Sequence, residues 1–220
     1  MKRIVPLLWL CGLPLWAQFN PDWLNSVVFS NQTGQDIYYL FFSPSDSEQW
    51  APDILGSEEV FSDGDLLERY LSYSGSSAFF DCQALDEEGN VYEVFRFRVS
   101  DDEEAYLELA GKDRTSKIDL DDFESRLIYF SVDNLTENEI YYLFLSPPDS
   151  DEYGIDFMDS GGSLEPGGSR EVALLNTGDP LSLDLQAVDE YDQTYSFSVD
   201  LDTGLDSQYV EILPEDLDQE

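Results

Sequence analysis

The stretch Ile37-Tyr38-Tyr39-Leu40-Phe41-Phe42-Ser43-Pro44 decides the fold of this 220-residue chain, because it is apolar on both faces and occurs twice. Ile140-Tyr141-Tyr142-Leu143-Phe144-Leu145-Ser146-Pro147 repeats it 103 residues later. At this offset, 25 of the 79 positions between Asn31–Leu109 and Asn134–Ile212 are identical without a gap. This identity indicates a tandem duplication, and a unit of about 100 residues is long enough to hold its own core.

Each unit consists of short apolar runs separated by Gly, Pro, Asn, Asp and Ser, a pattern typical of β-strands joined by turns. In the first copy we expect strands at Ser26–Ser30, Ile37–Ser43, Val60–Ser62, Leu66–Ser72, Ala78–Leu85, Val91–Val99 and Ala105–Leu109. We therefore predict an all-β protein of two tandem antiparallel β-sandwich domains of the Ig-like type. A small barrel in each unit is the alternative.

The run Ala78–Leu85 shows how such a strand is buried. Phe80, Cys82 and Ala84 alternate with Asp81 and Gln83, so the apolar set lies on one face of the strand. In the second copy, Leu185 stands where the first has Cys82. We therefore predict that Cys82 is a small buried hydrophobic residue and not a nucleophile.

The duplication also sets the expected domain boundaries. We expect domain 1 at 18–111, a linker at 112–122, and domain 2 at 123–220 with an acidic C-terminal tail. Four basic residues gather in or beside the linker, namely Lys112, Arg114, Lys117 and Arg126. They indicate either a short solvated linker or cations that bridge the two acidic domains and reduce their repulsion.

The N-terminus is typical of an export signal. Lys2 and Arg3 precede an apolar run from Ile4 to Trp16, and Ala17 is a suitable cleavage position. We predict a signal peptide at 1–17 and a periplasmic or extracellular protein, with lipidation at Cys11 as the less favoured alternative. No second long apolar run occurs, so we expect no membrane span.

The charge of the chain excludes one class of partner. The 48 acidic and 10 basic side chains give a formal net charge of −38, and removal of 1–17 leaves −40. Such a polyanion is repelled by phosphate, so we expect no nucleic-acid partner. Metal cations and basic partners remain, and adaptation to concentrated salt is an alternative explanation of the acidity.

Acidic loop residues that recur in both copies are candidate calcium ligands, because Ca²⁺ takes six to eight oxygen ligands. The candidates are Asp46, Asp53, Asp86 and Glu87 in the first copy, and Asp149, Asp156, Asp189 and Glu190 in the second. Their spacing matches no known calcium loop. The alternative is local structure, in which Asp46 caps a helical turn with Gln49 and the acidic pairs are turn residues.

Aromatic residues offer a second kind of site. Tyr38, Tyr39 and Trp50 could line a ligand surface in the first copy, because tyrosine and tryptophan stack on sugars and anchor protein interfaces. The alternative is that they pack within the sandwich. Enzymatic function is not expected, since the chain has no histidine, no phosphate-binding loop and no nucleophile elbow.

The segment Ile-Tyr-Tyr-Leu-Phe-x-Ser-Pro-x-Asp-Ser, followed by Trp50, Asp53 and Leu55-Gly56, resembles an uncharacterised type of small secreted bacterial β-domain. The later turn Leu85-Asp86-Glu87-Glu88-Gly89 fits the same resemblance. The second copy departs from it at Tyr153, Met158 and Asp159. The resemblance implies a β-fold and export, and no activity.

These observations lead to a functional expectation. We expect an exported, non-catalytic binding or structural module that recognises a protein or cell-envelope partner, with no cofactor other than supporting Ca²⁺. The alternative is a carbohydrate-binding module that uses the aromatic residues of domain 1.

Overall fold

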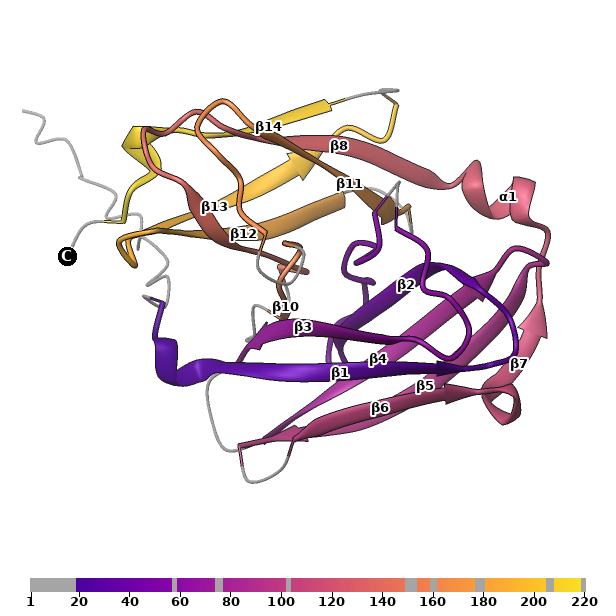
Figure 1. Cartoon of the computed structure of the whole chain (residues 1–220). Coiled ribbons are helices and arrows are strands. Elements are labelled where there is room, and N and C mark those ends of the chain that lie inside the picture. The colour runs from indigo at the N-terminus through magenta and orange to yellow at the C-terminus, as the bar shows by residue number, and fades with distance from the viewer. Residues whose placement is uncertain are drawn as a thin grey trace, which may run out of the picture.

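The computed structural model describes residues 19–56, 59–73, 77–101, 104–148, 154–158, 162–176, 181–204 and 208–218. The expected signal peptide at 1–17 lies outside these residues. The described chain is mostly β-structure arranged in four sheets, with one short α-helix, α1 (Leu120–Glu124) (Figure 1). Among the described residues, no helix is long and apolar enough to cross a membrane.

The two copies have the same strand order. Their strands are β1 (Leu24–Gln32), β2 (Ile37–Pro44), β3 (Leu66–Ser72), β4 (Ser77–Asp86), β5 (Asn90–Ser100) and β6 (Ala105–Ala110), then β8 (Leu127–Asn134), β9 (Ile140–Ser146), β11 (Ser169–Leu175), β12 (Leu181–Asp189), β13 (Thr194–Leu201) and β14 (Gln208–Ile212). In the first copy, β3-β1-β6 and β2-β4-β5 are adjacent strands, and β11-β8-β14 and β9-β12-β13 match them in the second. The expected strand Val60–Ser62 is reduced to an isolated bridge between Ile37 and Phe61.

We expected purely antiparallel sheets, but two of the sheets also contain a parallel pairing. β1 pairs with β3 antiparallel but with β6 in parallel, and β8 pairs with β14 in parallel in the same way. A hairpin forces its two strands to run in opposite directions. β6 instead follows β5, which belongs to the other sheet. The chain therefore crosses from one sheet to the other before β6 begins, and β6 can pair with β1 in the parallel direction. Two of the four sheets are therefore mixed.

The alternation predicted for Ala78–Leu85 is confirmed between Phe79 and Ala84, whereas Leu85 is buried in another cluster. Phe80, Cys82 and Ala84 of β4 are buried, whereas Phe79 on the opposite face is exposed. In β12, Leu181, Leu183, Leu185 and Ala187 are buried at the matching positions. Burial raises the pKa of the Cys82 thiol, which keeps it protonated, as expected of a core residue.

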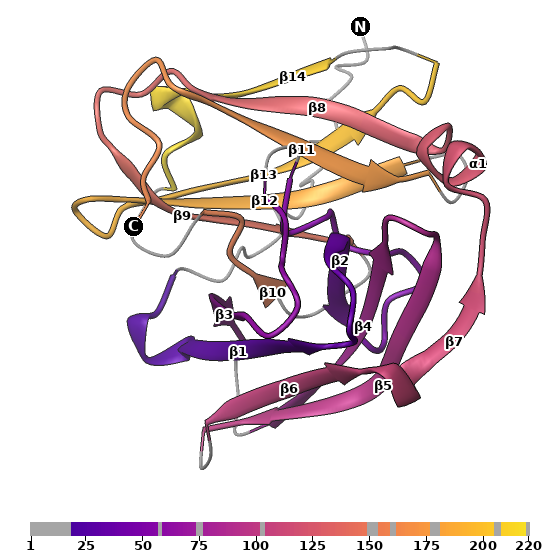
Figure 2. The same cartoon turned by 45° about the vertical axis from the view of Figure 1, so that its right-hand side comes forward.

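The two copies exchange short backbone pairings. The two-residue strand β10 (Gly154–Ile155) belongs to the second copy but pairs with β3 of the first (Figure 2). The amide of Asp156 donates to the carbonyl of Tyr70, and the amide of Asp53 donates to the carbonyl of Ala173, both at 2.8 Å. Because these bonds are related by the repeat offset, the contact is reciprocal, as in a two-fold dimer.

Clusters of buried apolar side chains join the copies. One of them contains Phe42 and Leu71 from the first copy together with Leu143 and Ile155 from the second. A smaller cluster places Phe41 of the first copy with Leu127 of the second. In Figures 1 and 2 the sheets of the first copy lie below those of the second, with β10 between them. The hydrophobic core therefore runs through the junction.

The segment 112–122, expected as a linker, contributes to the first copy. The turn Gly111–Asp113 leads into β7 (Arg114–Lys117), which pairs with β5 as the fourth strand of its sheet, and α1 begins at Leu120. The ammonium of Lys117 lies 3.6 Å from the carboxylate of Glu88 in the same copy. Gly89, at φ +77°, permits this packing, since a Cβ there would lie 2.3 Å from the carbonyl oxygen of Ile118.

Candidate functional site

The predicted aromatic surface of the first copy is divided. Tyr39 packs edge-on against Phe123 of α1 at 5.1 Å, and its hydroxyl donates to Glu124 at 2.9 Å. The pKa of Tyr39 is raised mainly by burial and, to a smaller extent, by this hydrogen bond. Trp50 is partly buried against Phe41. These two rings pack where the repeats meet, whereas Tyr38 is exposed.

Asp86 and Asp189 organise turns. One oxygen of Asp86 accepts from the amides of Glu88 and Asn90, and the other accepts from the Asn90 side chain and the Tyr92 hydroxyl, at 2.7–3.0 Å. Asp189 also accepts four bonds, three at positions equivalent to those of Asp86 and the fourth from the side chain of Asn138. Both carboxylates are therefore saturated by donors of the protein itself.

The other acidic candidates are dispersed. Glu87, Glu190 and Asp46 are exposed, and Asp149 lies outside the described residues. The Ser47 hydroxyl, not Asp46, accepts the amide of Gln49, so the expected capping by Asp46 is replaced by a serine turn. Within the described ranges, no group of three or more His, Cys, Asp or Glu side chains is placed to hold a metal ion.

Asp53 and Asp156 hold equivalent buried positions at the junction. Oδ1 of Asp53 accepts from the amides of Leu40 and Leu55, and Oδ2 is buried with no hydrogen-bond partner among the described residues. Oδ1 of Asp156 accepts from the amides of Leu143 and Met158. Burial raises the pKa of each carboxyl to about 7, although the amides, and for Asp156 also Arg69 and Arg170, act in the opposite direction.

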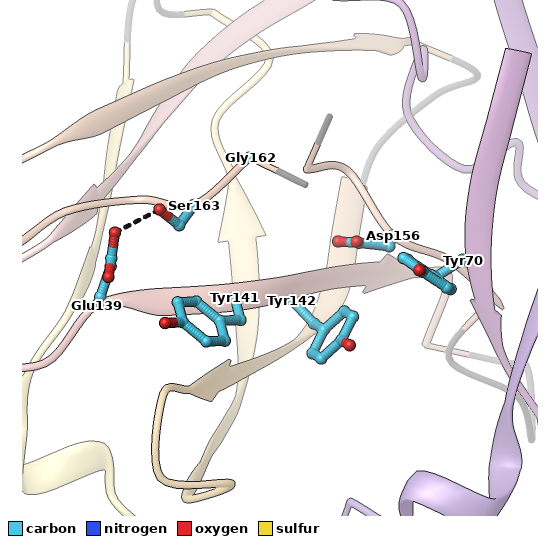
Figure 3. A pocket seen from close by; sticks show the side chains of 7 residues that line it. All are labelled: Tyr70, Glu139, Tyr141, Tyr142, Asp156, Gly162 and Ser163. Atoms are coloured by element: carbon cyan, nitrogen blue, oxygen red, sulfur yellow. Dashed lines mark hydrogen bonds between the residues drawn. The ribbon is translucent and has the colours of Figure 1, made fainter. Parts of the chain in front are cut away.

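A pocket of about 330 Å³ opens beside Asp156 at this junction (Figure 3). Its walls are formed by Tyr70, Glu139, Tyr141, Tyr142, Asp156 and Ser163. Tyr70 comes from β3 of the first copy and all the others from the second copy. The Ser163 hydroxyl donates to Glu139 at 2.5 Å on one side, and Asp156 and Tyr70 stand on the other. The pocket therefore depends on both copies.

Two consecutive tyrosines of β9 line the same pocket, although neighbours on a regular strand point to opposite faces. The cause is a β-bulge, in which Tyr142 pairs with Val188 and Ile140 with Asp189, so Tyr141 is the extra residue. The Tyr142 ring is packed by Phe19, Phe144 and Tyr70 at 5.7–6.1 Å. Tyr141 is 44% exposed and offers its ring to the pocket.

The matching positions of the first copy have a different chemistry. Val60 stands at the position of Ser163, and Glu59 at that of Gly162, where it forms an ion pair with Arg69. Across the junction, Ala173 stands at the position of Tyr70. The combination of three tyrosines, two carboxylates and a hydroxyl therefore occurs beside Asp156 and not at the matching positions beside Asp53. Sequence reasoning missed Tyr70, Glu139 and Ser163. No local pattern connects Tyr70 with lining residues of the other copy, and Glu139 and Ser163 are 24 residues apart in the chain.

No protein-family model matches this sequence, and a search of curated proteins found no similar chain.

Proposed function

We propose that the protein is an exported, non-catalytic binding module that recognises a basic protein partner through its acidic surface. The charge balance carries this proposal. Even if each of the ten basic residues neutralised one acidic residue, 38 carboxylates would remain without a cationic partner. Such a surface attracts cationic partners over a Debye length, accelerates their association and repels other acidic proteins.

The structural roles of the buried acids support a non-catalytic module. The carboxylates of Asp86 and Asp189 accept hydrogen bonds from donors in their own turns. Those of Asp53 and Asp156 accept hydrogen bonds from backbone amides at the junction of the copies. Histidine, the residue most often used for proton transfer in catalysis, is absent from the chain. Export is supported by the basic start and apolar run of residues 1–17.

Carbohydrate binding is the second candidate, and one observation favours it. The pocket beside Tyr141 combines an exposed aromatic ring with carboxylates that can accept hydroxyl protons. The aromatic pair Tyr39 and Trp50 supports it less, because both rings are packed. We also propose that each copy is a variant Ig-like sandwich, supported by its six strands divided between two sheets.

The test measures binding of the full chain to small folded basic proteins immobilised on a sensor surface, with neutral glycans on parallel channels. We expect a saturable complex of fixed stoichiometry that weakens as NaCl rises from 50 to about 500 mM. Poly-glutamate of equal charge is the control for non-specific attraction. If poly-glutamate binds the basic proteins as strongly as the full chain does, or if the full chain binds only glycans, the proposed function is wrong.

A further inference from the structure

We propose that the pocket between the copies binds the guanidinium group of an arginine side chain. This inference rests on the proposed function, because it names the part of a basic partner that the protein would recognise. The volume of about 330 Å³ is at the small end of ligand pockets and suits one side chain rather than a long segment. Three aspects of the lining specify the chemistry of that side chain.

The lining is rich in hydrogen-bond acceptors. Glu139 and Asp156 contribute two carboxylates, and none of the described lining residues is basic. The hydroxyl proton of Ser163 is already donated to Glu139, so it is not offered to a ligand. A guanidinium carries five N–H donors and no acceptor, so its N–H groups can be matched by the two carboxylates.

The aromatic surface suits a planar cation. The bulge turns Tyr141 into the pocket beside Tyr142, and Figure 3 shows the Tyr141 ring on the same side as Glu139. A guanidinium can stack on such a ring while it donates to a neighbouring carboxylate. Stacking of a guanidinium on a ring occurs among the described residues, where the guanidinium of Arg96 lies 4.6 Å from the centre of the Phe79 ring.

Asp156 places a second carboxyl on the other side of the pocket. Its carboxylate is almost fully buried, points into the pocket in Figure 3, and is fixed by two backbone amides. Burial raises its pKa to about 7, although the two amides, Arg69 and Arg170 act in the opposite direction. Once Asp156 is ionised, a ligand cation between Glu139 and Asp156 is attracted from both sides, in surroundings where water screens the charges less than at the surface.

The experiment measures chemical shifts of the tyrosine rings by NMR while arginine amide is added to the full chain. Lysine amide tests the planar shape of the cation, citrulline amide tests its charge, and glucose tests the carbohydrate alternative. We expect arginine amide to shift the signals of Tyr141 and Tyr142 saturably and at least fivefold more tightly than lysine amide. Citrulline amide and glucose should leave these signals unchanged.

Matched variants locate the site. Tyr141→Ala and Glu139→Gln should each weaken binding of arginine amide about tenfold, which corresponds to ~1.4 kcal/mol. Tyr38, which is 37% exposed, is the counterpart of Tyr141 in the first copy, so Tyr38→Ala is the control and should bind as the unchanged chain does. Thermal melts verify the fold of each variant, and Tyr141→Leu replaces Tyr141→Ala if the alanine variant does not fold.

The outcomes separate this inference from the proposed function. Equal binding of citrulline amide, or equal losses in Tyr38→Ala and Tyr141→Ala, would overturn the pocket assignment, and shifts with glucose alone would favour a carbohydrate site. If Tyr141→Ala and Glu139→Gln still bind basic proteins normally, the pocket inference is wrong while the proposed function stands. If arginine amide enters the pocket but no basic protein binds, the proposed function is the part that fails.

Discussion

The backbone amide of Asp156 donates to the carbonyl of Tyr70 at 2.8 Å and so joins the second copy to a strand of the first. The equivalent bond from Asp53 to Ala173 has the same length. Aromatic contacts between the copies are also reciprocal. Phe123, which precedes β8, packs on Tyr39 of the first copy, and Phe19, which precedes β1, packs on Tyr142 of the second. The repeats therefore associate as the halves of a symmetric dimer within one chain.

Ile155→Ala should destabilise both copies together. Ile155 lies in β10, is fully buried and belongs to the core cluster that joins the copies. Truncation of such a side chain leaves a cavity and costs about 2–4 kcal/mol. We expect one thermal transition, by circular dichroism and by tyrosine fluorescence, at a lower midpoint. Leu66→Ala on the exposed end of β3 is the control, and two separate transitions of which only one shifts would contradict the prediction.

Asp53→Asn and Asp156→Asn should stabilise the protein increasingly as the pH rises. Burial raises each pKa from 3.8 to about 7, so each carboxyl stabilises the fold below pH 4 and loses that contribution as the pH rises towards 7. Asparagine keeps an oxygen for the backbone amides without an ionisable group. At pH 8 we expect a gain of at least ~2 kcal/mol, or about 4–8 °C in midpoint.

The measurement for these two variants is a series of thermal melts between pH 4 and pH 8. Asp46→Asn, at an exposed position, controls for the removal of one negative charge from a highly acidic chain. A midpoint difference between variant and unchanged protein that is constant over this range would show that neither carboxyl titrates between pH 4 and pH 8.

Asp86→Ala should be strongly destabilising. The change removes four hydrogen bonds and leaves the buried Asn90 amide and Tyr92 hydroxyl without their acceptor. We expect a loss of about 3 kcal/mol in urea unfolding. Glu87→Ala, at the exposed neighbouring position, should change stability by less than about 0.5 kcal/mol. Similar losses for the two variants would argue against the structural role of Asp86.

Calcium should act on this protein only as a general salt. The saturated carboxylates of Asp86 and Asp189 leave no oxygen of these residues unoccupied for a metal ion. We expect CaCl₂ and MgCl₂ to shift the thermal midpoint equally at matched ionic strength. A rise of several degrees with Ca²⁺ alone, reversed by EDTA, would instead support a specific calcium site.

Gly89→Ala should be much more harmful than Gly34→Ala. Both residues have positive φ, at +77° and +82°, so each alanine variant carries a backbone penalty of about 1 kcal/mol. Only at Gly89 would the new methyl group meet a backbone atom, the carbonyl oxygen of Ile118, at 2.3 Å. We expect the loss in urea unfolding to be at least ~2 kcal/mol larger for Gly89→Ala. Equal losses would show that the segment after β7 moves enough to accommodate the new methyl group.

Much of the local structure could be predicted from the chain. The alternation through Phe80, Cys82 and Ala84 identified the buried face of β4, because side chains on a strand alternate with a period of two. The recurring acids Asp86 and Asp189 marked two turns, although hydrogen bonds of the protein occupy them. The bulge that brings Tyr141 beside Tyr142 could not be predicted, since it appears only once β9 and β12 are in register.

The sequence by itself determined the duplication, the positions of most strands, the buried face of β4 and the excess of negative charge, since each is written in consecutive residues or in composition. The tertiary structure alone decided that β1 runs parallel to β6, that β10 joins β3, and that Tyr70 meets Asp156 beside a pocket. The physical reason is that the period of a strand is set by neighbouring residues, whereas the pairing of strand edges depends on the path of the whole chain and on which apolar faces it buries together.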